Sequence, residues 1–553
     1  MTSRPPALEN GTDALPLIGR WLPDRNATVA FEPAAIAAAA ANPRETIHIV
    51  RESGWGRLGI AIGGQTERDA VRDTLRKTES LPLVATLSPL YPEWLGDRSF
   101  CETHGVRFPY ASGEMANGIA STRMVRAMAG ADMLGFFGAA GLSYSQVAQA
   151  VGELAAIPKG RVWGVNIIHS PNDPSLEEQL ADLLIRSRVP CVSASAFMKL
   201  TPAIVRCAAA GLRVDAQGNV LRARQVFAKI SRAELATQFM SPPPAAMLRD
   251  LVSRGLITPL EADLAARLPV AEDITVEADS AGHTDNRPLT VILPAILELR
   301  SAIAERDPSY PRIRVGAAGG LGTPAAVAAA FALGADYVMT GSVNQAAVES
   351  GLSQEGKVLL SKADFADVAM APSADMFELG VKVQVLKRGT MFAGRASRLY
   401  ETFVRYEGLA AIPPDVRARL ESEVFQKSLE QAWEETKEYW RQHGPSEVER
   451  AQREPKYLMA LTFRQYLGLS CRWAIGGDSS RRPDYQIWCG PAMGAFNRWV
   501  AGSFLADLAN RSVAQIALNL LEGAAVLVRA YQLRTHGVPV PPSAFHFVPR
   551  PLE

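Results

Sequence analysis

Between residues 107 and 351, short hydrophobic runs alternate with longer runs in which polar and apolar positions recur at helical spacing. The short runs are apolar on consecutive positions, a pattern typical of strands buried on both faces. We predict strands at residues 107–114, 131–138, 161–168, 189–195, 224–231, 273–280, 313–320 and 336–342. We predict helices at residues 122–130, 143–154, 175–187, 201–211, 233–240, 289–306, 324–334 and 344–350.

Eight strand–helix units within about 250 residues match the size of a closed (β/α)8 TIM barrel. An open, doubly wound parallel sheet is the alternative that this pattern leaves open. Two insertions interrupt the repeat, and we expect both at barrel ends, where loops often carry function. Residues 211–223 predict a hairpin that turns at Gln217 and Gly218, and residues 241–270 predict a helical pair.

The segments outside the repeat predict two further domains in this α/β protein. Residues 1–100 form a small N-terminal α/β unit, with a helix at 31–43 and strands at 56–64 and 81–88. We assign residues 101–375 to the barrel and residues 376–553 to a helical C-terminal lid or substrate domain. Within this last domain, residues 413–457 predict a highly charged helical run, and residues 490–533 predict further helices.

Composition narrows the class of protein. The chain is 48% hydrophobic and carries a net charge of +1, which argues against nucleic acid as its main partner. Its five cysteines show neither a C-x-x-C pair nor zinc-finger spacing, so we expect a reducing cytoplasm, no disulfide frame and no metal site. The N-terminus has no signal-peptide pattern, and the apolar run at 516–528 contains Asn519 and Glu522. We therefore expect a cytoplasmic protein without a membrane partner.

A glycine-rich segment, Gly316–Gly322, follows the seventh predicted strand and opens a helix at Pro324. Glycines let backbone N–H groups approach a phosphate closely, and a helix N-terminus adds a favourable partial charge. A second turn at Gly341 and Ser342 ends the eighth strand. Paired turns after strands seven and eight match the phosphate site of a barrel. A Rossmann site, which requires an acidic residue after the next strand, and a pair of turns without a ligand are the alternatives.

A histidine, His283, follows the sixth predicted strand. The carboxyl ends of the strands form the active face of a barrel, where a histidine can donate a proton or polarise a carbonyl. The neighbouring Glu277, Asp279 and Asp285 are expected to fix its tautomer. A structural histidine bonded to a loop carbonyl is the alternative.

Other polar residues lie at the ends of predicted strands. Lys229 lies in an otherwise apolar strand, where it requires an anionic or polar partner. The carbonyl-bearing edge of a bound cofactor ring would be such a partner, and a carboxylate pair with Glu277 is the alternative. Asn166 ends the third strand, and Glu114 follows the first. His169, in a loop, is a weaker catalytic candidate. Ser193 and Ser195 lack the companions of a catalytic triad.

Several separate segments, in the same order along the chain, resemble one family. Residues 276–288 and 316–351 resemble the 2-nitropropane dioxygenase-like flavoproteins. More narrowly, residues 371–392 and 485–500 resemble the trans-acting enoyl reductases of polyunsaturated fatty acid and trans-acyltransferase polyketide synthases. The resemblance spans roughly residues 108–530.

This resemblance implies a barrel that binds FMN, which NADPH or NADH would reduce. The substrate would be an α,β-unsaturated thioester carried by an acyl carrier protein, and the partners would be that carrier protein and, as an open alternative, a second copy of the chain. By position, His283 matches the family's active-site histidine. The positions that match its cofactor-binding residues are Gly113, Asn166, Lys229, Gly282, Gly319, Gly320, Gly322, Gly341 and Ser342. Ala281 departs from the family, which usually has a second glycine before the histidine.

A run of basic residues lies in the predicted C-terminal domain. We expect Lys387, Arg388, Arg395 and Arg398 to form a solvated basic surface, with binding of a phosphopantetheine phosphate or of the 2′-phosphate of NADPH as the alternative. A nitronate monooxygenase would use the same barrel, FMN and histidine. A flavin-free scaffold of a synthase is the non-enzyme alternative.

Overall fold

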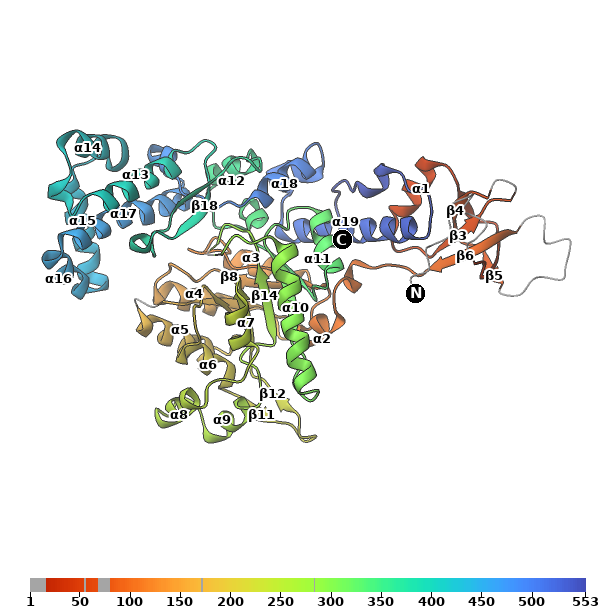
Figure 1. Cartoon of the computed structure of the whole chain (residues 1–553), viewed down its shortest axis with the longest axis horizontal. Helices are drawn as coiled ribbons and strands as arrows, with labels where there is room; N and C mark the ends of the chain where they lie inside the picture. Colours follow the sequence, from red (N-terminus) through yellow and green to blue (C-terminus); the bar gives the residue numbers. More distant parts are fainter. Residues whose placement is uncertain (1–15, 54–55, 68–79, 171–172, 283) are drawn as a thin grey trace, which may run out of the picture. The chain divides into compact units, whose positions relative to one another are not determined.

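The computed structural model describes residues 16–53, 56–67, 80–170, 173–282 and 284–553 (Figure 1). Its central feature is a closed barrel of eight parallel strands that follow one another in chain order. The strands are β7 (Tyr110–Ser112), β8 (Leu134–Phe137), β9 (Gly164–Ile168), β10 (Cys191–Ser195), β13 (Gln225–Ile230), β14 (Asp273–Glu277), β15 (Arg314–Ala318) and β16 (Val338–Thr340). β16 pairs with β7 and closes the barrel, which confirms the predicted TIM barrel and excludes the open sheet.

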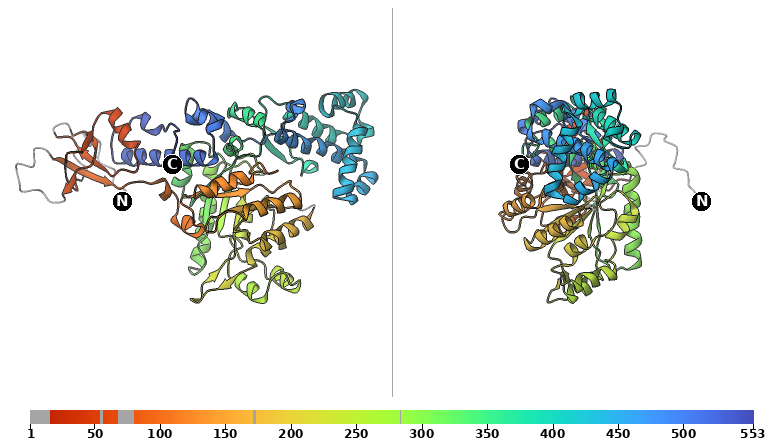
Figure 2. Two further views of the ribbon diagram at one scale, coloured as in Figure 1. Left: turned by 180° about the vertical axis from the view of Figure 1, so that it is seen from behind. Right: turned by 90° about the vertical axis from the view of Figure 1, so that its left-hand side faces the viewer.

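Helices connect successive strands and lie outside them, as both views of Figure 2 show for the orange-to-green segments. They are α3 (Thr122–Gly130), α4 (Tyr144–Leu154), α5 (Pro174–Arg186), α6 (Pro202–Ala209), α7 (Ala233–Phe239), α10 (Leu289–Arg306) and α11 (Pro324–Ala332). Ser121, Ser143, Asp173 and Thr201 cap the first four of these helices through their side chains. These seven predicted helices are confirmed.

The eighth predicted helix, at residues 344–350, is wrong. A short 3-10 helix, η3 (Ser342–Ala346), follows β16, and the next α-helix is α12 (Gln354–Ser361). The side-chain amide of Asn344 donates to the Thr340 carbonyl oxygen at 3.1 Å. In a helix that starts at residue 344, the backbone N–H of Val348 would bond to the Asn344 carbonyl oxygen. It donates instead to the carbonyl oxygen of Arg511 at 2.9 Å, which accounts for the difference.

Both insertions have the predicted structure but lie away from the mouth of the barrel, which we define as the end where the strand carboxyl termini meet. Strands β11 (Arg213–Val214) and β12 (Val220–Leu221) form the hairpin, and α8 (Ala245–Ser253) and α9 (Pro259–Ala265) form the helical pair. Each insertion follows a helix and precedes a strand, so it lies at the amino ends of the strands (Figure 1). Neither insertion therefore contributes to the mouth.

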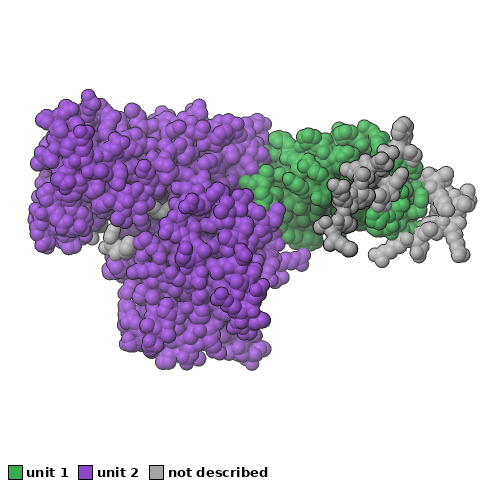
Figure 3. Space-filling view, viewed as in Figure 1, with its two compact units in different colours: residues 1–95, 324–329, 517–553 green, residues 96–323, 330–516 purple. Residues whose placement is uncertain are grey.

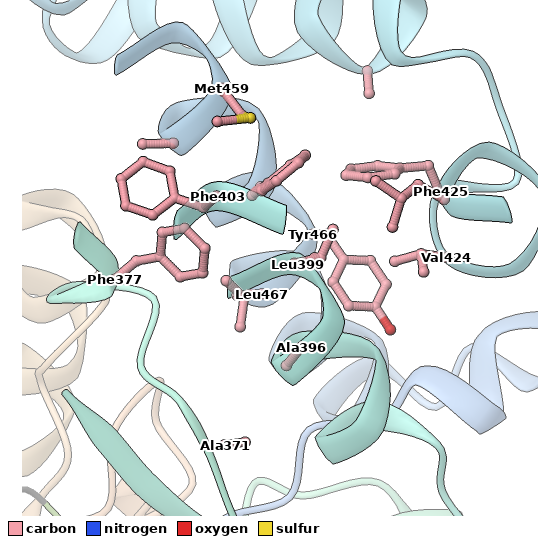
Figure 4. Close-up of a cluster of buried hydrophobic side chains, with 14 of the residues drawn as sticks. Ala371, Phe377, Ala396, Leu399, Phe403, Val424, Phe425, Met459, Tyr466 and Leu467 are labelled. Carbon is pink, nitrogen blue, oxygen red and sulfur yellow. The ribbon is translucent and has the colours of Figure 1, made fainter. Parts of the chain in front are cut away.

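A helical region follows the barrel and includes an antiparallel hairpin. Its helices are α13 (Phe392–Arg405), α14 (Pro414–Arg419), α15 (Leu429–His443), α16 (Pro445–Arg453), α17 (Pro455–Gly476) and α18 (Pro491–Val500), and the hairpin is β17 (Val368–Pro372) with β18 (Lys382–Leu386). Aromatic side chains, among them Phe377, Phe403 and Tyr466, pack at its centre (Figure 4). Ala371 and Val383, paired across the hairpin, belong to this core. The opposite face of the hairpin therefore carries Gln384.

By contacts, the chain divides into two units (Figure 3): residues 96–323 with 330–516, and residues 1–95 with 324–329 and 517–553. The second of these contains a six-stranded antiparallel sheet in the order β2-β4-β3-β6-β1-β5. Four of its strands are β1 (Gly19–Leu22), β2 (Thr28–Ala30), β3 (Ile47–Arg51) and β5 (Gln65–Glu67). Helix α1 (Pro33–Ala40) and strands β4 (Leu58–Ile62) and β6 (Leu81–Leu87) confirm the predicted elements. The division follows contacts rather than chain order, and the predicted three-part boundaries stay a prediction.

The helix α19 (Val513–Thr535) is long and apolar enough to cross a membrane by length and composition alone. Of the apolar window, 78% is buried inside the protein. Ala530 and Leu533 pack in one core with Ile36, Ile49 and Ile60. This burial is typical of the core helix of a globular protein, and we give α19 that role.

Candidate functional site

A buried lysine lies between two carboxylates at the mouth of the barrel. The Lys229 ammonium nitrogen, on β13, is 3.3 Å from Oε1 of Glu114 and 3.1 Å from Oε1 of Glu277. Glu114 follows β7, and Glu277 ends β14. The exposed fractions of the Lys229, Glu114 and Glu277 side chains are 12%, 5% and 16%. The predicted carboxylate partner Glu277 is therefore present, and Glu114 is a second one.

The ion pair between Lys229 and Glu114 keeps these two groups charged despite their burial. Burial by itself lowers the pKa of the Lys229 ammonium, but the charges of Glu114 and Glu277 outweigh it and hold the pKa above its usual value. Burial also favours the neutral form of Glu114, yet Lys229 and the hydroxyl groups of Ser195 and Ser193 hold its pKa below the usual 4.5. The cluster thus presents fixed charges at the mouth.

Hydrogen bonds extend this cluster across neighbouring strand ends. The hydroxyl groups of Ser193, at 3.0 Å, and Ser195 both donate to Oε1 of Glu114. The Asn166 side-chain amide donates to the Ser195 hydroxyl at 3.3 Å. Oδ1 of Asn166 accepts from the backbone N–H groups of Ala139 and Ala140 at 2.8 Å and 3.2 Å. The network fixes the orientation of Asn166, one of the predicted cofactor-binding residues.

The two predicted phosphate turns leave open space above two of their glycines. Gly320 has a φ of +74°, and no described atom lies within 4 Å of the position of a Cβ added there. At Gly341, too, no described atom lies within 4 Å of the position of an added Cβ. Gly319 has a φ of +85°, and a Cβ there would lie 2.8 Å from the Ala278 carbonyl, so only glycine fits this turn. A ligand group can therefore approach the backbone of Gly320 and Gly341.

Close packing by the protein surrounds two of the other predicted glycines. A Cβ on Gly322 would lie 2.1 Å from the Ala492 carbonyl oxygen, and one on Gly113 would lie 3.0 Å from Cγ of Met339. Packing against backbone requires glycine at Gly322, whereas a side chain at Gly113 would only require the flexible Met339 side chain to shift by a few tenths of an ångström. Gly282 is exposed and Ser342 is half-buried. Cofactor binding by these four, and by the other predicted cofactor-binding residues, stays a prediction.

His283 lies outside the described residues, and its catalytic role stays a prediction. The acidic residues predicted to fix its tautomer have other partners. Glu277 pairs with Lys229, and Asp285 pairs with Arg232 at 2.7 Å. Asp279 accepts a hydrogen bond from the side-chain amide of Gln384 at 2.5 Å.

Sequence reasoning missed Ser193, Ser195 and Gln384 as parts of the mouth. The two serines lie two positions apart on β10, so they share one face, and this spacing was a usable signal for inward polar groups. Gln384 lies on β18, 105 residues after the aspartate it contacts. No local pattern predicts such a contact.

The weaker histidine candidate, His169, belongs to a structural network. Its Nδ1 lies 3.1 Å from Oε2 of Glu177, and its ring stacks on Phe197. The Thr201 hydroxyl, at the start of α6, also donates to Glu177. These contacts tie the loop after β9 to the neighbouring helices.

Carboxylates neutralise most of the predicted basic run. Arg388 pairs with Asp367 at 3.0 Å, Arg395 pairs with the buried Asp484, and Arg398 pairs with Glu423. Lys387 is exposed. Each of the three arginines thus has a carboxylate partner, and phosphate binding by this basic run stays a prediction. In the described part of the chain, no group of three or more His, Cys, Asp or Glu side chains is arranged to hold a metal ion.

The fold and the polar mouth place the chain among (β/α)8 barrel proteins with a site at the strand carboxyl ends. The enoyl reductase domain of MlnA, from the macrolactin biosynthesis cluster of Bacillus amyloliquefaciens, is 36% identical with a TM-score of 0.76. The alignment covers 80% of this chain and 99% of that domain. The chain belongs to the family of enoyl reductases of polyketide and polyunsaturated fatty acid synthases, with the 2-nitropropane dioxygenase-like fold.

Longer relatives contain the same region. A polyunsaturated fatty acid synthase polypeptide of Thraustochytrium sp. is 48% identical over 449 residues, which cover 80% of this chain and 30% of that polypeptide. Polyketide biosynthesis protein PksE of Bacillus subtilis is 43% identical over 440 residues, which cover 79% of this chain and 57% of PksE. This chain thus spans less than two thirds of each. Residues 406–485 also match the inserted helical domain of acyl-carrier-protein S-malonyltransferase.

Proposed function

We propose that this protein is an FMN-dependent enoyl-thioester reductase that uses NADPH or NADH as reductant. The observation that carries the proposal is the 36% identity with the enoyl reductase domain of MlnA across 99% of that domain. The proposed substrate is an α,β-unsaturated acyl thioester on an acyl carrier protein of a polyketide or polyunsaturated fatty acid synthase. The synthase relatives support this partner. We also propose a cytoplasmic location, on composition alone.

The residues at the mouth fit a flavin mononucleotide. The open backbone above Gly320 and Gly341 suits a phosphate group, which backbone N–H groups bind well. The Lys229 ammonium suits the carbonyl-bearing edge of the ring. When bound, FMN would accept a hydride from the reduced nicotinamide and deliver it to the β-carbon of the enoyl thioester.

The protein's own residues would bind and orient the reactants and supply a proton. Asn166 and Lys229 are held in place by hydrogen bonds and ion pairs, so their polar groups are already oriented before a ligand arrives. His283 is the candidate proton donor for the α-carbon, as the sequence predicts. The helical region after the barrel is the candidate cover that excludes water from the mouth.

The proposal predicts that the purified protein is yellow and oxidises NADPH only when an enoyl-thioester is present. The test is an anaerobic assay with a crotonyl thioester of pantetheine or carrier protein, followed by the loss of NADPH absorbance and by mass spectrometry for the gain of two hydrogens. Oxygen uptake with a nitroalkane and no need for NADPH would instead support a nitronate monooxygenase. A colourless protein that binds no added FMN would support a scaffold.

The substitution His283→Ala is expected to lower kcat by about 10²–10⁴-fold, the usual contribution of a general acid. The flavin content should stay at the wild-type level, because the predicted phosphate turns lie elsewhere. Turnover and the absorbance ratio of flavin to protein measure the two effects. His283→Gln retains a hydrogen-bond donor but cannot titrate, so it should be similarly slow. Wild-type turnover in either variant would remove His283 from the reaction.

A further inference from the structure

One carboxylate oxygen at the mouth is left without a partner among the described residues. Oε1 of Glu114 accepts hydrogen bonds from Ser193 and Ser195 and faces Lys229, whereas Oε2 is buried and accepts no hydrogen bond from any other described residue. A buried acceptor without a donor is unfavourable, because the oxygen has lost its hydrogen bonds to water and gained none in return. Oε2 of Glu114 is therefore a position where a donor from a bound molecule would be strongly favoured.

A donor lies beside this free acceptor. The Lys229 ammonium has three N–H groups, and the carboxylates of Glu114 and Glu277 account for two of them. Lys229 contacts Oε1 of Glu114, and Oε2 of the same carboxylate is free. The remaining N–H of Lys229 and this free oxygen therefore lie close to each other. The mouth thus offers an acceptor and a donor next to each other.

This pair matches one edge of a flavin ring. The pyrimidine edge of an isoalloxazine carries a ring N–H, at N3, between two carbonyl oxygens. Resting on the proposed function, we propose that Glu114 is a cofactor-binding residue whose Oε2 accepts the N3–H of FMN. Lys229 donates to the neighbouring ring carbonyl. The pair would then select the flavin ring by complementary donors and acceptors.

Glu277 provides a matched control for this role. Both carboxylates contact Lys229, and replacing either with glutamine removes one negative charge beside the ammonium. If Glu114 acted only by holding Lys229, the two substitutions would weaken FMN binding equally. Within the described part of the chain, Glu277 does not have a buried, unpartnered oxygen, and its side chain is more exposed. A difference between the two variants therefore reports on the free oxygen of Glu114.

The experiment titrates flavin-free wild-type, Glu114→Gln and Glu277→Gln proteins with FMN, followed by quenching of flavin fluorescence. We expect Glu114→Gln to raise the Kd for FMN by about 10- to 150-fold, the value of one hydrogen bond to a charged group. Glu277→Gln should raise it much less. Thermal unfolding of the flavin-free proteins checks that both variants fold. Equal Kd values for the two variants would overturn the assignment of Glu114.

A second probe keeps the test independent of how the variants fold. FMN methylated at N3 lacks the ring donor, and wild-type protein should bind it at least about tenfold more weakly than FMN. Equal binding of the two flavins by wild-type protein would overturn the proposal. If wild-type protein binds no flavin at all, the proposed function fails. If it binds FMN but does not distinguish the methylated form, only the role of Glu114 fails.

Discussion

Replacing Lys229 with methionine is expected to destabilise the protein by about 3–5 kcal/mol at neutral pH, the usual effect of breaking a buried ion pair. The ammonium lies within 3.3 Å of Glu114 and 3.1 Å of Glu277. Without it, two carboxylates would face each other at a partly dry site. Thermal or urea unfolding of the flavin-free variant measures the decrease in the free energy of unfolding. Lys229→Arg keeps the positive charge, so its free energy of unfolding should decrease less.

The pH dependence of this loss gives a sharper test. In the wild-type protein the pKa of Glu114 lies below its usual 4.5, so its stabilising contribution is present above pH 4.5 and disappears as the pH falls through the lowered value. In the methionine variant the pKa of Glu114 should rise instead, because burial then dominates. The free energies of unfolding of the wild-type protein and of Lys229→Met should therefore differ less at about pH 5 than at about pH 8. An equal difference in the free energy of unfolding at both pH values would show that loss of the ion pairs does not cause the destabilisation.

The substitution Gly320→Asp should abolish tight binding of FMN. The position above Gly320 is open, so an added carboxylate can occupy the place proposed for the phosphate. Repulsion between two unit charges about 4 Å apart near a protein surface is about 4 kcal/mol, or roughly a thousandfold in Kd. The measurement is the flavin content of the purified variant and the Kd of its flavin-free form.

Gly320→Asn is the matched control for this substitution. Asparagine has nearly the shape of aspartate, and both residues tolerate the positive φ of +74° at this position better than most side chains. The two variants should therefore fold with similar stability, while only the aspartate repels a phosphate by charge. Wild-type flavin content in Gly320→Asp would mean that the phosphate binds elsewhere. Equal losses in both variants would show that side-chain bulk, rather than charge, is responsible.

Local hydrophobic periodicity was sufficient to predict the barrel units. The eight strands are short and buried, and most of their residues are apolar, so neighbouring residues alone carry the signal. Helix caps such as Ser143 and Asp173 act within four residues of their position, and the helix boundaries were predictable for the same reason. The prediction of a helix at residues 344–350 was wrong because the backbone N–H of Val348 donates to the distant Arg511 carbonyl, a tertiary contact that apolar spacing does not encode.

The sequence by itself determined the strand–helix repeat, the glycine turns and the need of Lys229 for an anionic partner. These features depend on residue type and on neighbours along the chain. Only the tertiary structure decided that the sheet closes through β16 and β7, and that Glu114 and Glu277 share one lysine. Glu114 and Lys229 are far apart in the sequence and meet only because parallel strand ends converge at the mouth of a barrel. Contacts of this kind arise from chain closure, which local patterns do not specify.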